Sequence, residues 1–122
     1  MREISVIELS AMLRSVAQNV AQKVAQNPGQ NPAEAPVLLD VREPWEWDLA
    51  RIDGSIHIPM NQISNKMNEI DQTRPTVVIC HHGARSMQVV AFLQRAGFDN
   101  LHNLAGGIDA WSRQIDPQVA LY

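Results

Sequence analysis

The residues of this chain best suited to chemistry lie together, in the run Cys80-His81-His82-Gly83-Ala84-Arg85-Ser86. Cys80 is the only cysteine, and the thiolate is the nucleophilic form of that side chain. Backbone N–H groups of a loop that leads into a helix favour such an anion. Arg85 is a permanent cation suited to an oxyanion, and Gly83 lets the backbone turn close to a ligand. The run therefore predicts an active-site loop, with Cys80 as the catalytic residue and residues 81–86 as the substrate-binding residues.

A second interpretation of Cys80 has to be weighed against this one. A single cysteine after an apolar strand is often a small buried hydrophobic residue without a chemical role. The neighbouring sequence favours function, because a β-branched run (76–79) precedes Cys80 and a helical pattern follows Arg85 and stops at Gly97. A nucleophile between a strand and a helix would lie at the carboxyl edge of a sheet, where ligands bind in open α/β folds.

The elements that must position this loop alternate between strand and helix patterns. Strands are expected at Ile4 and within 37–41, 56–59, 76–79 and 98–104, and helices from Ser5 to about Gln26, from Pro44, over 60–70, over 85–96 and from 105 onward. Such alternation predicts an α/β fold, with a mostly parallel sheet of four or five strands and helices on both faces. Trp111 is expected in the core. The segment after Pro117 shows no pattern from which a role can be predicted.

Asp40 and Arg42 follow the second predicted strand and are candidates for supporting residues. The carboxyl ends of parallel strands share one edge, so Asp40 and Cys80 are expected on the same side of the sheet. Two roles stay open for Asp40: contact with substrate, or a structural role in which it caps the next helix or fixes the loop through Arg42.

The amino-terminal part combines a helix start with an unusual repeat. Ser5 and Glu8 have the spacing of a capping box. A four-residue Val-Ala-Gln repeat then fills 15–26, and Pro28, Gly29 and Pro32 should end the helix. We interpret the chain as one domain over 1–122, with an Ala/Gln/Asn-rich helix and loop extension at about 15–36 whose role the sequence does not give.

Length, composition and charge limit the classes of protein to which this chain can belong. The 122 residues suffice for one domain with its own core, and a formal net charge of −3 argues against nucleic-acid binding. The first residues lack the apolar part of a signal peptide, and no apolar run reaches the ~20 residues of a membrane span. One cysteine forms no internal disulfide. These features predict a soluble cytoplasmic protein without a membrane partner, a monomer or weak dimer.

Three stretches together resemble the rhodanese (sulfurtransferase) family of the single-domain type, from residue 37 onward. They are Leu39-Asp40-Val41-Arg42-Glu43, the run from Cys80 to Ser86, and Leu104-Ala105-Gly106-Gly107-Ile108-Asp109-Ala110-Trp111; Gly54-Ser55-Ile56-His57-Ile58-Pro59 is a weaker fourth match. The chain departs from the family at Ala50-Arg51-Ile52-Asp53, where Gly-His-Ile-Pro is usual, and at His81 and His82, where many thiosulfate-using members are more basic.

The resemblance implies a mechanism without a metal or an organic cofactor. Cys80 would take the sulfane sulfur of a donor such as thiosulfate, release sulfite and carry a persulfide. Amides from about His81 to Ser86 would stabilise the anionic sulfur, and Arg85 would hold the donor or close the loop. The outer sulfur would pass to cyanide, a small thiol or a protein acceptor.

Other functions remain open from the sequence alone. Cysteine-dependent phosphatases place five residues between cysteine and arginine, whereas this chain places four, and the shorter loop favours a sulfur atom over a phosphate. A zinc site would use Cys80 with His57, His81, His82 or His102, but adjacent histidines lack the usual spacing. A sulfur-relay or regulatory module with little thiosulfate activity is the third alternative. Because His81 and His82 titrate near neutral pH, we also expect sulfur uptake to slow as pH rises.

Overall fold

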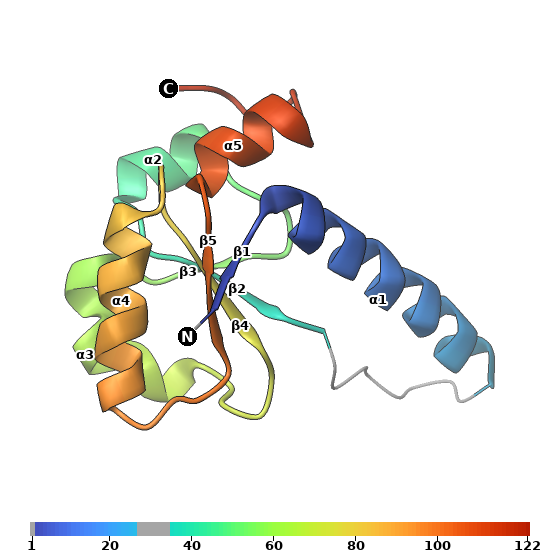
Figure 1. Ribbon diagram of the computed structural model, residues 1–122, viewed down its shortest axis with the longest axis horizontal. Helices are drawn as coiled ribbons and strands as arrows, with labels where there is room; N and C mark the ends of the chain where they lie inside the picture. The colour runs from blue at the N-terminus through green and yellow to red at the C-terminus, as the bar shows by residue number, and fades with distance from the viewer. Residues whose placement is uncertain (1, 27–34) are drawn as a thin grey trace.

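The computed structural model describes residues 2–26 and 35–122, and the side chains of 19–26 are not part of that description (Figure 1). In chain order its elements are β1 (Arg2–Ile4), α1 (Val6–Gln26), β2 (Val37–Asp40), α2 (Pro44–Leu49), β3 (Ile56–His57), the 3₁₀ turn η1 (Met60–Gln62), α3 (Ile63–Lys66), the 3₁₀ turn η2 (Met67–Glu69), β4 (Thr76–Ile79), α4 (Ala84–Arg95), β5 (Leu101–Leu104) and α5 (Gly107–Gln114). None of the helices in the described ranges is long and apolar enough to cross a membrane.

The five strands form one sheet in the order β1-β5-β4-β2-β3, and every neighbouring pair is parallel. The predicted α/β fold with a parallel sheet is confirmed. In the register of the sheet, Asp40 of β2 pairs with Ile79 of β4 and with His57 of β3. Cys80, which follows Ile79 directly, therefore lies beside the end of β2, as the sequence predicts.

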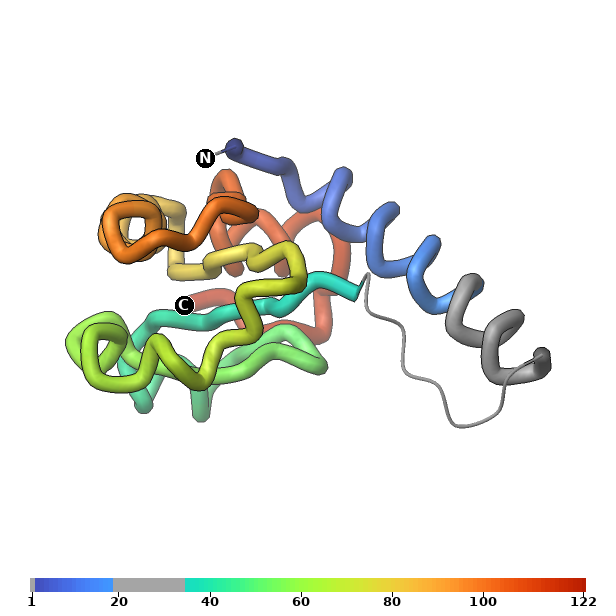
Figure 2. The backbone as a smooth tube through the Cα atoms, turned by 90° about the horizontal axis from the view of Figure 1, so that it is seen from below, coloured from blue at the N-terminus to red at the C-terminus, as the bar shows by residue number. Residues whose placement is uncertain are grey.

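Apolar side chains fill both faces of the sheet, because its central strands are buried over their whole length. One core cluster joins the sheet to α3 and α4 and includes Cys80. The other joins the opposite face to α1 and α5 and includes Trp111, as expected. Figure 1 shows α3 and α4 on one side of the strands and α1 and α5 on the other, and Figure 2 shows the same arrangement from below.

Most local predictions hold, with one exception in the 60–70 region. The capping box is present, since Glu8 N donates to Ser5 Oγ over 3.0 Å and Ser5 N donates to Glu8 Oε1 over 3.2 Å. Helix α1 is helical up to Gln26, the last residue described before a gap; the proline-containing segment expected to end the helix (27–34) lies outside the described residues. The single helix expected over 60–70 is instead divided into η1, α3 and η2. Its polar residues, among them Asn61, Asn65 and Asn68, favour turns over a continuous helix.

Candidate active site

Cys80 lies at the carboxyl end of β4, with its sulfur beneath the loop that follows. The residue is only 1% exposed and belongs to an apolar cluster, yet its sulfur has two polar neighbours. Gly83 N donates to Sγ over 3.0 Å, and Ser86 Oγ lies 3.3 Å from Sγ. The loop thus surrounds the thiol with a backbone amide and a hydroxyl, which are groups that stabilise an anionic sulfur. Of the loop amides predicted to face the sulfur, Gly83 supplies the one bonded to it among the described residues.

The hydroxyl of Ser86 joins the sulfur to β5. Asn103 Nδ2 donates to Gly83 O over 3.3 Å, so the carbonyl oxygen of the Asn103 amide faces Ser86, and a short hydrogen bond joins Ser86 Oγ to Asn103 Oδ1. Gly83 O lies 3.1 Å from the same hydroxyl. A hydroxyl has one proton, and here three acceptors compete for it. An anionic sulfur is the strongest of the three, so we expect the proton to turn toward Sγ when the thiolate forms.

Helix α5 holds the first half of the loop in place. Ile108 N donates to Cys80 O over 2.9 Å, and Asp109 N donates to His81 O over 3.1 Å. These bonds turn the loop carbonyls away from the sulfur and toward the start of α5. Gly107 makes this approach feasible, because a Cβ at its φ of +60° would collide with the backbone carbonyls of Cys80 and His81.

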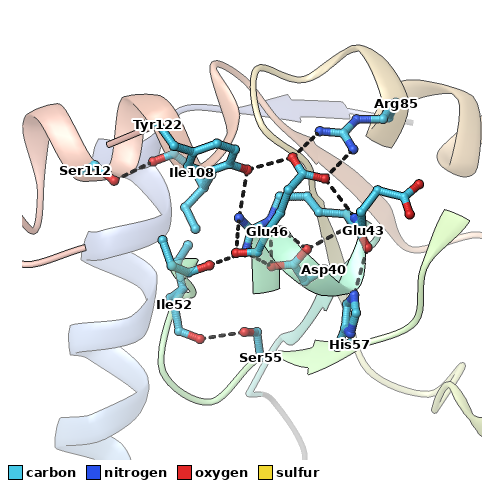
Figure 3. A network of polar contacts seen from close by, with 12 residues as sticks. Asp40, Glu43, Glu46, Ile52, Ser55, His57, Arg85, Ile108, Ser112 and Tyr122 are labelled. Carbon is cyan, nitrogen blue, oxygen red and sulfur yellow. Dashed lines mark hydrogen bonds and ion pairs between the residues drawn. The ribbon is translucent and has the colours of Figure 1, made fainter. Parts of the chain in front are cut away.

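Arg85 is anchored by a carboxylate from α2. Its Nη1 and Nη2 atoms lie 2.7 and 2.8 Å from the two oxygens of Glu46, whose side chain is 3% exposed. Glu43 N donates to Glu46 Oε2 over 2.8 Å, and Tyr122 OH donates to Oε1 over 2.8 Å (Figure 3). The hydrogen bonds from Arg85 are the main reason that the pKa of Glu46 is lowered to about 2. Glu46 is therefore ionised at neutral pH and offsets much of the charge of Arg85.

Asp40 and Arg42 form a buried ion pair close to the Arg85–Glu46 pair. Arg42 is fully buried, and its Nε and Nη2 bind the two oxygens of Asp40 over 2.9 and 2.7 Å. The remaining guanidinium hydrogens bind the carbonyl oxygens of Glu46 and Ala50 and the hydroxyl of Tyr122. Burial is the largest single influence on the pKa of Arg42 and lowers it, but the hydrogen bonds and charge interactions with Asp40 and Tyr122 together outweigh burial and raise the pKa. Of the two roles considered for Asp40, this geometry supports the structural one.

The two histidines after Cys80 stack on each other at the edge of the site. Their ring centroids are 4.0 Å apart, and the ring of Tyr122 lies 4.0 Å beyond His81, tilted by only 7°. The pKa of His81 is lowered, mainly by burial and to a smaller extent by the nearby charge of His82. His81 is therefore neutral at neutral pH and contributes less positive potential there than the sequence alone suggests. His57 is used elsewhere, with Nε2 2.7 Å from Arg42 O and its ring stacked on Trp47.

One group of metal-ligating side chains is found within the described part of the chain. It joins His81, His82 and Asp109, whose ligand atoms lie within 4.8 Å of one another, and it does not include Cys80. Zinc binds imidazole nitrogen in the plane of the ring at about 2.0–2.1 Å. Rings stacked at 4.0 Å with an angle of 28° do not aim their nitrogens at a common point, and Asp109 already binds Arg113 over 3.0 Å. Metal binding here would require both rings to rotate.

Three residues of the site were not singled out from the sequence as active-site residues. Glu46 lies in a short helix that the sequence predicts, but its pairing with Arg85 was not predicted. Asn103 lies in a short strand without a chemical motif. Tyr122 belongs to the segment after Pro117, for which the sequence predicts no role, and the structure brings it into contact with Glu46 and His81. Two cavities, of about 520 and 260 Å³, are lined by residues other than Cys80.

Comparison with known proteins places the chain in a family. The sequence model that describes the family named rhodanese-like domain matches residues 20–114 of this chain. The chain is 40% identical over 84 residues to a protein named sulfurtransferase from Allochromatium vinosum, covering 69% of this chain and 78% of that protein. It is 39% identical over 87 residues to the probable adenylyltransferase/sulfurtransferase MoeZ of Mycobacterium tuberculosis, covering 70% of this chain but only 22% of MoeZ.

A solved structure agrees with these matches. The rhodanese-related protein of Thermoplasma volcanium is 30% identical, and its fold matches over 100% of both chains with a TM-score of 0.75. The family match covers most of the chain and includes the Cys80 loop, its supporting strands and the start of α5. The chain belongs to the rhodanese-like domain family.

Proposed function

We propose that this chain is a rhodanese-type sulfurtransferase that carries sulfane sulfur as a persulfide on Cys80. The observation that supports this most directly is the position of Cys80 Sγ, 3.0 Å from Gly83 N and 3.3 Å from Ser86 Oγ, at the end of a parallel strand. Such donors stabilise a charged sulfur before and after it takes up a second sulfur atom. The sulfurtransferase name of the Allochromatium vinosum relative agrees with the proposal.

In the first step the thiolate of Cys80 attacks the sulfane sulfur of thiosulfate. A new sulfur–sulfur bond forms, the sulfur–sulfur bond of thiosulfate breaks, and its electron pair leaves with sulfite. Cys80 is left with a persulfide anion, so charge and atoms balance without an external oxidant. The hydroxyl of Ser86 and the amide of Gly83 lie beside the attacking atom and can stabilise its charge.

In the second step a nucleophilic acceptor attacks the outer sulfur. The persulfide bond breaks, and its electron pair returns to Cys80 as the thiolate. With cyanide the product is thiocyanate, and with a thiol it is a new persulfide. Because Cys80 is only 1% exposed, a small acceptor reaches the sulfur more easily than a bulky one. The Cys80 thiolate should therefore react more slowly with bulky aromatic disulfides than with thiosulfate.

One observation favours a sulfur relay with little thiosulfate activity as the second candidate. Glu46 is ionised and offsets the charge of Arg85, so a dianion such as thiosulfate finds less net positive charge at the loop than the sequence suggests. A donor with lower charge, such as the persulfide of a thiol, loses less from this pairing. Comparing kcat/KM for thiosulfate and for a thiol persulfide separates the two candidates.

The test of the function is thiocyanate formation from thiosulfate and cyanide. We expect turnover by the parent chain and none by Cys80→Ser, which keeps the size of the side chain but removes the sulfur. An aryl phosphate offered to the same samples measures the rival phosphatase activity, and we expect no hydrolysis. Thiocyanate formation at equal rates by the parent and by Cys80→Ser would refute the proposal.

A further inference from the structure

Tyr122 reaches the active loop through a folded segment that follows α5. Asp116 N donates to Trp111 O over 3.0 Å, and Val119 N donates to Asp116 O over 3.1 Å, so a hydrogen-bonded turn reverses the chain after the helix. Val119 and Tyr122 pack against the core cluster on the α1 and α5 face of the sheet. Figure 1 shows this segment leaving α5 and passing over α2. The turn after α5 and the packing of Val119 and Tyr122 therefore fix the position of Tyr122.

The hydroxyl of Tyr122 stands between two charged side chains. Arg42 Nη1 donates to it over 2.8 Å, and it donates to Glu46 Oε1 over 2.8 Å (Figure 3). Arginine is always a donor, so the phenol must direct its single proton to the carboxylate. Burial, together with the nearby Glu46, raises the pKa of Tyr122 to about 12, and the hydroxyl keeps that proton at neutral pH.

The ring of Tyr122 makes a second contact with the loop. It lies parallel to the ring of His81 at 4.0 Å, while its edge meets Trp45 at 5.7 Å. His81 is the first residue after Cys80, and Arg85, which shares Glu46 with the hydroxyl, lies in the first turn of α4, directly after the loop. One side chain thus contacts one end of the loop directly and the other end through Glu46.

We propose that Tyr122 is a positioning residue of the sulfur-transfer site, which fixes Arg85 through Glu46 and His81 through ring stacking. This inference rests on the proposed function of the Cys80 loop. Without the hydroxyl, Glu46 loses one of its hydrogen bonds and Arg42 loses one acceptor, so the Glu46–Arg85 pair is held less firmly. Without the ring of Tyr122, His81 loses one of the two aromatic rings that stack on it.

Two substitutions separate these effects. Tyr122→Phe removes the hydroxyl and keeps the ring, whereas Tyr122→Leu removes both. Leu121→Ala is the matched control, because Leu121 belongs to the same segment and is 53% exposed. For Tyr122→Phe we expect the KM for thiosulfate to rise about tenfold, the effect of one hydrogen bond to a charged group, while kcat changes much less.

Nuclear magnetic resonance of the full chain tests the positioning without depending on activity. For Tyr122→Phe we expect the Arg85 Nε–H resonance to shift or broaden while the pKa of His81 stays lowered. For Tyr122→Leu we expect the pKa of His81 to rise toward 6.5 as well, and for Leu121→Ala we expect neither change. The phenylalanine variant keeps the test decisive if the leucine variant fails to fold. An unchanged Arg85 resonance in folded Tyr122→Phe would overturn the inference, even if the parent proves to carry no sulfur.

Discussion

Arg85 and Glu46 are 39 positions apart in sequence but meet in a two-point ion pair, with nitrogen–oxygen distances of 2.7 and 2.8 Å. The pair joins the first turn of α4, which follows β4, to helix α2, which follows β2. Because β2 and β4 are adjacent and parallel, the segments after them leave the same edge of the sheet. The topology therefore brings the loop arginine to its carboxylate.

The stability that this pair contributes to the fold should be lost at acidic pH. The pKa of Glu46 is lowered from 4.5 to about 2, so its contribution is complete above 4.5 and is lost as pH falls from 4.5 toward 2. The shift corresponds to a loss on the order of 3 kcal/mol. We expect the unfolding free energies of the parent and of Glu46→Gln to differ most at neutral pH and to converge near pH 2. Asp48→Asn, an exposed change in the same helix, should behave like the parent; a constant difference between parent and Glu46→Gln would contradict the assignment.

Gly107 offers a test of the contact between α5 and the loop. Gly107→Ala places a Cβ against the carbonyls of Cys80 and His81, whereas Gly97→Ala, also at positive φ, meets no atom within 4 Å. Both variants carry the backbone strain of a left-handed residue, about 1–2 kcal/mol. We expect Gly97→Ala to lower stability by that amount and to keep the turnover rate of the parent. Gly107→Ala should lose more stability and most of its activity, and equal activity in the two variants would speak against the contact.

Ser86 should affect the chemistry at the sulfur more than the stability of the fold. Removing a hydroxyl that can bond a charged sulfur should slow sulfur uptake by roughly tenfold. Ser112→Ala is the control, because Ser112 is also buried and donates to Ile108 O over 3.0 Å, away from the sulfur. Single-turnover rates of persulfide formation measure the effect. If Ser86→Ala and Ser112→Ala load sulfur equally fast, Ser86 does not act on Cys80.

The pH dependence of sulfur uptake should reflect the lowered pKa of His81. Because burial keeps His81 neutral, its positive charge appears only below the ordinary value of 6.5. We expect His81→Phe, which keeps an aromatic ring against Tyr122, to match the parent profile above pH 6.5 and to lose the rate increase below it. Rates of persulfide formation are measured in the parent and in His81→Phe from about pH 5 to about pH 8. This range spans the pKa of an ordinary histidine. A difference between the profiles confined to pH above 6.5 would contradict this assignment.

The sequence predicts the elements of this fold because the relevant signals are local. The β-branched run before Cys80, the capping box of Ser5 and Glu8 and the proline at the start of α2 each determine structure within a few residues. The 60–70 region is less regular than predicted, because its buried residues follow helical spacing while its asparagines favour turns.

The candidate site was predictable to a smaller degree. Cys80, Gly83 and Arg85 share one run, so their types and spacing indicate a joint role. Glu46 and Tyr122 approach that run only through the tertiary fold, over separations of 39 and 37 residues from Arg85. Glu46 is part of the capping box at the start of α2, but that local motif does not indicate its long-range pairing with Arg85. Their contribution follows from hydrogen bonds that no local pattern records.

The most direct test of the account is the intact mass of the chain after incubation with thiosulfate and removal of excess donor. We predict that the parent gains the mass of one sulfur atom, loses it again on addition of cyanide, and that Cys80→Ser gains none. A parent mass that stays unchanged while Cys80 remains reactive toward small alkylating reagents would contradict the claim that Cys80 carries the transferred sulfur.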